Sequence, residues 1–283
     1  MKPVLKVLHP GAGCSLQDPG RPGWKRYGVP AGGAMDRESA GWANRLVGNP
    51  EEAPVLELAL TGARLQVLRE AELALTGADV DGSHPRWRSF FVRAGEEIQF
   101  RGMRGGVWSY LAVAGGFVGP RWFGSVSVNA RAGFGSACGP GTELVAGEAS
   151  RLSAVASRYV REAERPRFSP EMEVPVWPGP EWEVLDPASA AQFLSGPWNI
   201  SPHGDRTGYR LDGPLLDISP RSMLSAPLAV GTIQLPPGGR PLVILRDGPT
   251  VGGYPRLAIV DPSALSRFTQ CAPGSTVRFR LLT

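Results

Sequence analysis

Polar loops rich in glycine carry the residues of this chain that could do chemistry. One lies between residues 246 and 255, and its chemistry-bearing members, with a nearby glutamine, are Gln234, Thr250, Gly252, Gly253 and Tyr254. Binding residues concentrate on loops that a rigid scaffold holds in place, so we expect these groups to form a polar cradle. The alternative is an ordinary connection between strands, with Tyr254 packed and the glycines at left-handed positions.

A second loop, Ser201 to Arg210, contains Asp205 and Arg206. The planar guanidinium of Arg206 could bind a carboxylate or a phosphate through two parallel hydrogen bonds, with Asp205 orienting the substrate. The alternative is an Asx-type turn with a surface ion pair, which contributes about 0–1 kcal/mol to stability.

A third loop begins with Gln17, Asp18 and Arg21 and continues through Gly32-Gly33 to Asp36. Adjacent glycines ahead of a helix could present backbone N–H groups to an anion. The alternative is that Asp18 and Arg21 pair with each other while Asp36 only caps the helix. Since the sequence offers no other candidate site, we expect the three loops to form a pocket.

Composition and motifs exclude several classes of function. The net charge of +4 is scattered without a basic run, which argues against nucleic-acid binding. The histidines are unpaired and no Cys/His cluster exists, so we expect no metal site. No phosphate-binding P-loop, nucleophile elbow or dinucleotide fingerprint occurs. An odd cysteine count of 3 without a secretory segment favours a reducing cytoplasm, and no apolar run is long enough to span a membrane.

The elements that must position these loops are mostly short strands. Apolar runs at 242–245 and 257–260, bounded by Gly and Pro, predict strands. Helices are predicted at 37–47 after an Asp36 cap, at 187–194 and at 262–268. Mostly β structure with a few short helices implies barrels or sandwiches. We expect an N-terminal β-rich domain at 1–160 and a second domain at 171–283, with a linker around 151–170.

Glycines also predict where the strands of the first half turn. The segment Leu58–Ala63 recurs identically as Leu73–Ala78, which suggests a meander with Gly at each corner. Strands at 97–100 and 110–113 are expected on either side of a glycine turn at 102–106. Residues 10–35 show no helical or strand period, which favours a long ordered loop with a function.

Several of these motifs together resemble a known family. They are Leu16–Gly23, Gly28–Asp36, Ala43–Pro50, Leu75–Asp79, Asp205–Gly213, Gly231–Pro237 and Thr250–Pro255, in the same order and at matching separation. The chain resembles the biotin-dependent carboxyltransferase family, which includes allophanate hydrolase subunit 2, KipA and the C subunit of 5-oxoprolinase (PxpC).

The resemblance implies β-barrel domains, the C-terminal one cyclophilin-like, and a cytoplasmic protein. It implies partners of the KipI/PxpB and PxpA types in an ATP-dependent 5-oxoprolinase that opens 5-oxoproline to glutamate. One alternative is a module that moves a carboxyl group to urea or a similar amide from carboxybiotin on another protein. Another is a KipA-type regulator without enzyme activity that binds a kinase inhibitor.

We divide the candidate residues of the loops by role. Catalytic candidates are Asp205, Arg206, Gln234, Thr250 and Tyr254. Substrate-binding candidates are Gln17, Asp18, Arg21, Gly32, Gly33, Met35, Asn44, Gly252 and Gly253. The chain departs from the family pattern at Gly204 and at Gly248-Pro249, next to candidate site residues. No side chain is a convincing nucleophile, so we expect the partner to contribute atoms.

Overall fold

The computed structural model describes residues 2–149, 158–217 and 223–282. Their contacts divide the chain into two units. The first comprises Met1–Arg21 with Gly32–Phe168, and the second comprises Pro22–Ala31 with Ser169–Thr283. Residues 22–31 therefore belong to the second unit, although they lie inside the expected domain of residues 1–160. Part of the expected linker, residues 151–157, lies outside the described residues, and its remainder up to Phe168 belongs to the first unit.

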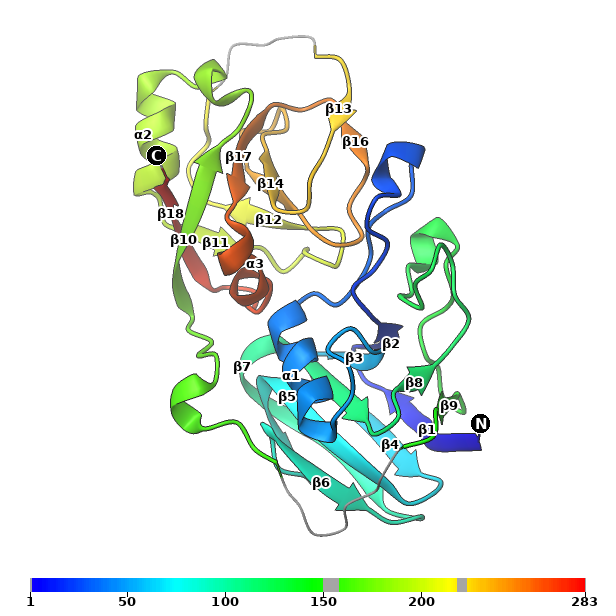
Figure 1. The fold of residues 1–283 in the computed structure, drawn as a ribbon. Helices are drawn as coiled ribbons and strands as arrows, with labels where there is room; N and C mark the ends of the chain where they lie inside the picture. The colour runs from blue at the N-terminus through cyan, green and yellow to red at the C-terminus, as the bar shows by residue number, and fades with distance from the viewer. Residues whose placement is uncertain (1, 150–157, 218–222, 283) are drawn as a thin grey trace. The chain divides into compact units, whose positions relative to one another are not determined.

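The first unit is built on a nine-stranded sheet. The path runs β2-β3-β7-β4-β1-β9-β8, with β5 pairing to both β6 and β7 (Figure 1). The strands are β1 Lys2–Pro10, β2 Gly13–Gln17, β3 Val55–Ala59, β4 Ala63–Val67, β5 Ala71–Gly82, β6 Arg88–Val92, β7 Glu97–Val113, β8 Phe117–Val118 and β9 Glu143–Ala146. Short 3-10 helices are η1 Lys25–Tyr27, in the segment that joins the second unit, η2 Ala130–Ala132 and η3 Glu162–Glu164.

The predicted helix after Asp36 is present as α1, Arg37–Val47. The Asp36 carboxylate accepts a hydrogen bond from the N–H of Ser39, and Gly48 ends the helix in a left-handed conformation. Both signals are local in sequence, which is why they predict the boundaries of the helix. Its buried face packs on β5 and β7.

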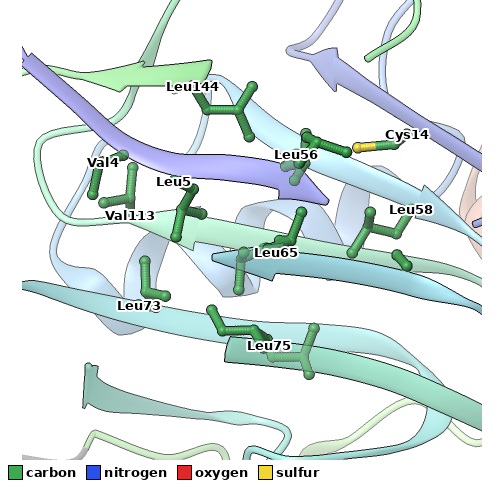
Figure 2. Packing of buried hydrophobic residues seen from close by; sticks show 14 of the residues in the cluster. Val4, Leu5, Cys14, Leu56, Leu58, Leu65, Leu73, Leu75, Val113 and Leu144 are labelled. Atoms are coloured by element: carbon green, nitrogen blue, oxygen red, sulfur yellow. The ribbon is translucent and has the colours of Figure 1, made fainter. Parts of the chain in front are cut away.

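The core of the first unit is aliphatic. Leu5, Leu56, Leu65 and Leu73 are fully buried, and they project from four strands toward one another (Figure 2). Burying a Leu side chain contributes about 1.5–3 kcal/mol, so this cluster fixes the strands that carry the loops.

Three expectations for this unit were wrong. Gly62 lies in a turn, but Gly77 lies inside β5, at an irregularity in its pairing with β7. The predicted glycine turn at 102–106 is part of one long strand, β7, because the pairing with β5 continues across it with register shifts. Residues 10–35 are not a single loop, since β2 pairs with β3 from Gly13 to Gln17.

The second unit is a closed barrel in the order β10-β17-β14-β15-β12-β11-β18, with a separate two-stranded sheet of β13 and β16. Its strands are β10 Glu171–Pro178, β11 Trp198–Ile200, β12 Gly208–Asp212, β13 Ala226–Pro227, β14 Thr232–Gln234, β15 Leu242–Ile244, β16 Val251–Gly252, β17 Arg256–Val260 and β18 Thr276–Leu281. Its helices are η4 Trp182–Val184, α2 Pro187–Ser195 and α3 Pro262–Thr269.

Both predicted helices of this unit are present with aspartate caps and Pro at the first position. On α2, Phe193 stacks on Phe279 of β18 with ring centroids 4.6 Å apart. The α3 helix packs on β10. The expectation of a mostly β fold with few short helices and barrel architecture is confirmed. The cyclophilin-like form of the second barrel stays a prediction.

Candidate functional site

In the first unit, Asp18 organises its loop. The carboxylate is 7% exposed and accepts hydrogen bonds from the hydroxyls of Ser125 (2.5 Å) and Ser127 (2.6 Å) and from the N–H groups of Gly20 (2.8 Å) and Val126 (2.9 Å). A carboxylate that accepts several hydrogen bonds is held in one orientation. Asp18 therefore ties its loop to the distant segment at 125–127.

Arg21 joins the same two segments. Its guanidinium is fully buried, donates to the carbonyls of Trp122 (Nε, 3.0 Å) and Ser127, and lies over the Phe134 ring at 4.5 Å. A Cβ at Gly32 would lie 2.7 Å from this guanidinium, so glycine is required for the close approach.

The other predicted binding residues of this unit are also interior. Gln17 donates to Ser15 and to the Val128 carbonyl. Asn44 donates to the carbonyls of Glu51 and Ala53. Gln17, Met35 and Asn44 are fully buried. Gly33 has a φ of +97°, and a Cβ there would meet the Pro19 carbonyl at 2.8 Å.

Glu57 and Tyr110 were missed by the sequence reasoning. The Glu57 carboxylate accepts from the Met35 N–H (2.8 Å) and from the Tyr110 hydroxyl (2.9 Å), which itself accepts from the Asp36 N–H (2.7 Å). Burial, and then the charges of Glu57 and Asp36, raise the pKa of Tyr110 well above its ordinary value, so the hydroxyl stays a neutral donor. An ionisable residue inside the apolar run Val55–Ala59 was the available signal.

A cavity of about 250 Å³ lies beside these residues in the first unit. Its walls are Asp18, Pro19, Ala34, Arg37, Ala40, Gly41, Glu51, Glu52, Ala53 and Val55. Among the predicted site residues of this unit only Asp18 lines it, and the others support the loops behind it.

In the second unit, Arg206 forms a bidentate pair with Asp247. The Nε–Oδ2 distance is 2.8 Å and the Nη2–Oδ1 distance is 3.1 Å, and the two side chains are 18% and 10% exposed. Backbone bonds from Asp247 to the Arg206 carbonyl and from Leu245 to the Thr207 carbonyl run beside it. The structure thus brings the 201–210 and 246–255 loops together.

Asp205 makes the Asx-type turn of the alternative interpretation, because its carboxylate accepts from the Thr207 N–H at 2.7 Å. The surface ion pair of that interpretation is wrong, because Arg206 pairs with Asp247 and is largely buried. At Gly248, where the chain departs from the family pattern, there is no room for a side chain. A Cβ there would lie 2.5 Å from Ile244 and 2.8 Å from the Thr207 carbonyl.

The predicted cradle is compact. Gln234 is 3% exposed and donates to the Tyr254 carbonyl at 3.1 Å, and a Cβ at Gly252 would lie 2.8 Å from its side-chain nitrogen. Tyr254 is 44% exposed, so the alternative interpretation, in which it packs inside, is wrong on this point. Gly252 and Gly253 do not adopt left-handed φ values, and Gly252 is required by close packing instead. Thr250 is half-buried, and its carbonyl accepts from the Leu228 N–H.

Lys25 and Arg246 were also missed. The Lys25 ammonium donates to the Leu228 carbonyl at 2.6 Å, and Leu228 directly follows β13, which pairs with β16 of the cradle loop. Burial, and then the charge of Arg246, lower the pKa of Lys25 below its ordinary value. Arg246 is only 7% exposed. The scarcity of lysine was a signal, because Lys25 is the one lysine away from the first strand.

No group of His, Cys, Asp and Glu residues that could hold a metal ion occurs within residues 2–149, 158–217 and 223–282. In the same ranges, no helix is long and apolar enough to cross a membrane.

Comparison with known proteins decides the family. Residues 27–281 match the model described as "Carboxyltransferase domain, subdomain A and B". The chain belongs to this carboxyltransferase domain family. The domain is 33% identical to the C subunit of 5-oxoprolinase from Escherichia coli, over 98% of this chain and 90% of the relative. It is 31% identical to the corresponding 5-oxoprolinase subunit from Haemophilus influenzae, over 99% of this chain and 92% of the relative.

A solved structure supports the assignment of the fold. The carboxyltransferase domain superposes on the urea amidolyase of K. lactis with a TM-score of 0.90 and 28% identity. The match covers 100% of this chain but only 19% of the urea amidolyase.

Proposed function

We propose that this carboxyltransferase domain is a subunit of an ATP-dependent 5-oxoprolinase complex that opens 5-oxoproline to glutamate in the cytoplasm. It acts with subunits of the KipI/PxpB and PxpA types. The observation that carries the proposal is the 33% identity to the C subunit of the Escherichia coli 5-oxoprolinase across 90% of that relative.

The chemistry of the second unit supports a small anionic substrate. 5-Oxoproline carries a carboxylate and a flat lactam group. Lys25 is half-buried and Arg246 is largely buried, and an approaching carboxylate relieves the repulsion between these two neighbouring positive charges. We assign them to hold the substrate carboxylate.

Further roles are proposed for Tyr254, Arg206 and the buried residues of the first unit. Tyr254 exposes its ring, and its hydroxyl can polarise the lactam carbonyl as negative charge develops on the oxygen. The Arg206 guanidinium is already paired with the Asp247 carboxylate through two hydrogen bonds, so its proposed role is to position the 246–255 loop. Gln17, Asn44 and Arg21 hold the loops of the first unit in shape.

Nucleotide is proposed to bind with the partner subunits, because the chain has no P-loop. The Lys25 and Arg246 charges fit an anionic group, which includes a phosphate as well as a carboxylate. When bound, ATP supplies the phosphoryl group that activates the lactam carbonyl.

The test is to purify the chain with both partner subunits and to measure ADP and glutamate formed from 5-oxoproline. Turnover that requires all subunits is expected. Lys25→Met should raise the KM for 5-oxoproline roughly tenfold, equivalent to about 1.4 kcal/mol. The matched control is Lys2→Met, an exposed lysine of the first strand, which should leave KM unchanged. Absence of turnover with tight partner binding would point to a regulator instead.

Carboxyl transfer is the second candidate, favoured by the match to the carboxyltransferase model and to the K. lactis urea amidolyase. Carboxybiotin carried by another protein would present a ureido ring, which is flat like urea and the lactam. Loss of carboxyl from carboxybiotin that depends on urea and on this chain would establish that reaction. In the same assay, 5-oxoproline should then produce no ADP.

A further inference from the structure

A second cavity, outside all the predicted site residues, lies in the barrel unit. Its volume is about 520 Å³, within the range of small-ligand sites. The lining residues are Ser201, His203, Arg210, Asp212, Arg240 and Leu242. They come from the ends of β11, β12 and β15, which are neighbours in the closed barrel.

The strand pattern directs the charged groups outward. Arg210 and Asp212 are two residues apart on β12, and the residue between them, Leu211, is fully buried. Side chains two apart lie on one face of a strand. Leu242 of β15 is the register partner of Arg210, and Arg240 precedes it by two residues. Rigid strands therefore hold the floor of this cavity, as an accurate binding site requires.

The charges of this cavity are only loosely paired with one another. Arg240 lies 3.7 Å from Asp212, and both side chains are well exposed, at 60% and 45%. The Arg210 side chain has no ion pair or hydrogen bond within the described ranges. The cavity therefore presents two guanidinium groups and one carboxylate, with the His203 imidazole beside them. A loose exposed pair contributes little that a ligand would have to replace.

We propose that this cavity binds an acidic α-amino acid. Such a molecule carries two carboxylates and one ammonium. Each carboxylate can face one of the two arginines, and the ammonium can face the aspartate. Guanidinium groups bind carboxylates through paired hydrogen bonds. The Ser201 hydroxyl adds a polar group, and Leu242 faces the aliphatic part of the ligand.

Asp212 makes a simple anion an unfavourable ligand for this cavity. A phosphate would satisfy the arginines but would place its charge close to Asp212, which repels it. A dicarboxylate without an amino group would compete with Asp212 for Arg240 and bring no cation of its own. Glutamate is also the product of the proposed reaction, and that link, unlike the binding itself, rests on the proposed function.

The test is calorimetric titration of the full chain, without partner subunits or ATP. The probes are L-glutamate, L-glutamine, glutarate and inorganic phosphate. Saturable binding of L-glutamate is expected, with glutamine and glutarate each roughly tenfold weaker, because each lacks one charged contact worth about 1.4 kcal/mol. Phosphate or glutarate binding as tightly as glutamate would overturn the proposal, as would no saturable binding of glutamate.

Two variants connect the binding to the cavity. Arg210→Gln should weaken glutamate roughly tenfold, and Asp212→Asn should abolish the preference for glutamate over glutarate. The matched control is Arg280→Gln, an exposed arginine of the same barrel that pairs with Glu173 on another strand. Equal weakening by the control would show a general charge effect and refute the site. Because turnover is not measured, a failed 5-oxoprolinase assay leaves this result standing.

Discussion

The Arg206–Asp247 pair allows a quantitative test of how the two loops of the barrel unit are joined. The change is Asp247→Asn, which keeps the shape of the side chain and removes its charge. Two charge-assisted hydrogen bonds at 2.8 and 3.1 Å lose their anionic acceptor, while the arginine stays 18% exposed. Breaking a buried pair costs about 3–5 kcal/mol and an exposed one about 0–1 kcal/mol. The low exposure places this loss at about 2–3 kcal/mol.

The assay is urea denaturation of the full chain, with the free energy of unfolding extrapolated to zero denaturant. The matched control is Glu173→Gln, which removes the carboxylate of the Arg280 pair at 2.7 Å in the same barrel. Those side chains are 54% and 65% exposed, so the control should lose less than about 0.5 kcal/mol. If Asp247→Asn loses no more than the control, burial does not strengthen the pair and the reasoning is refuted.

A double variant separates the pair from its surroundings. Arg206→Met alone leaves the Asp247 charge buried, and it should cost about as much as Asp247→Asn. Arg206→Met with Asp247→Leu replaces both charges with apolar groups and should recover part of the loss. Strictly additive losses would show that the two side chains do not stabilise each other.

Three further predictions concern other parts of the fold. The hydrogen bonds from Arg256 lower the pKa of Glu181, so this pair stabilises the protein above the ordinary pKa of 4.5, and the stabilisation is lost as pH falls through the lowered value. Glu181→Gln should therefore flatten the loss of stability as pH falls below 4.5 in denaturation curves, and an unchanged slope would contradict it. Gly77→Ala should lower the free energy of unfolding by more than about 3 kcal/mol, because its Cβ would lie 2.3 Å from a carbonyl of β7. Gly95 has a similar φ of +91° but open space around it, so Gly95→Ala should cost only about 1 kcal/mol. Thermal melting of both variants measures the difference. Equal losses of stability in the two variants would show that the backbone φ alone, and not the space for the side chain, sets the cost. Tyr110→Phe leaves a buried N–H and a buried carboxylate each without one partner, so we expect a loss of about 1–3 kcal/mol in urea denaturation, and a loss under 0.5 kcal/mol would show that water replaces the hydroxyl.

Local signals predicted the helices of this protein well. Asp36, Asp186 and Asp261 each cap the helix that follows, and each cap is formed by residues within a few positions of it. Propensity and capping are properties of neighbouring residues, so they can be recognised without knowledge of the fold.

Long-range pairing could not be predicted from the same signals. Glycines at 102–106 indicated a turn, yet β5 pairs along this stretch and carries β7 through it as one strand. The Lys25 ammonium donates to a carbonyl 203 residues away, and Arg21 contacts segments more than 100 residues away. Such contacts depend on the topology of the sheet and not on the residues beside them.

The candidate site shows the same division. For the glycines of the cradle the alternative interpretation expected a left-handed backbone, but Gly252 does not adopt one, and close packing is the reason for glycine there. Arg206 was expected to offer its fork to a ligand, and the partner that fills it, Asp247, lies 41 residues away. A sequence shows which side chains can bind, whereas the fold decides which of them are already engaged.

The assignment of residues 22–31 to the second unit has a consequence for synthesis on the ribosome. This segment is made early, but the barrel that it contacts begins at Ser169. The Lys25 bond to Leu228 cannot form until the chain has been made past residue 228. While the first unit is being synthesised, residues 22–31 therefore lack the barrel that they contact in the finished chain. A fragment that starts at residue 171 would in turn lack these residues of the second unit.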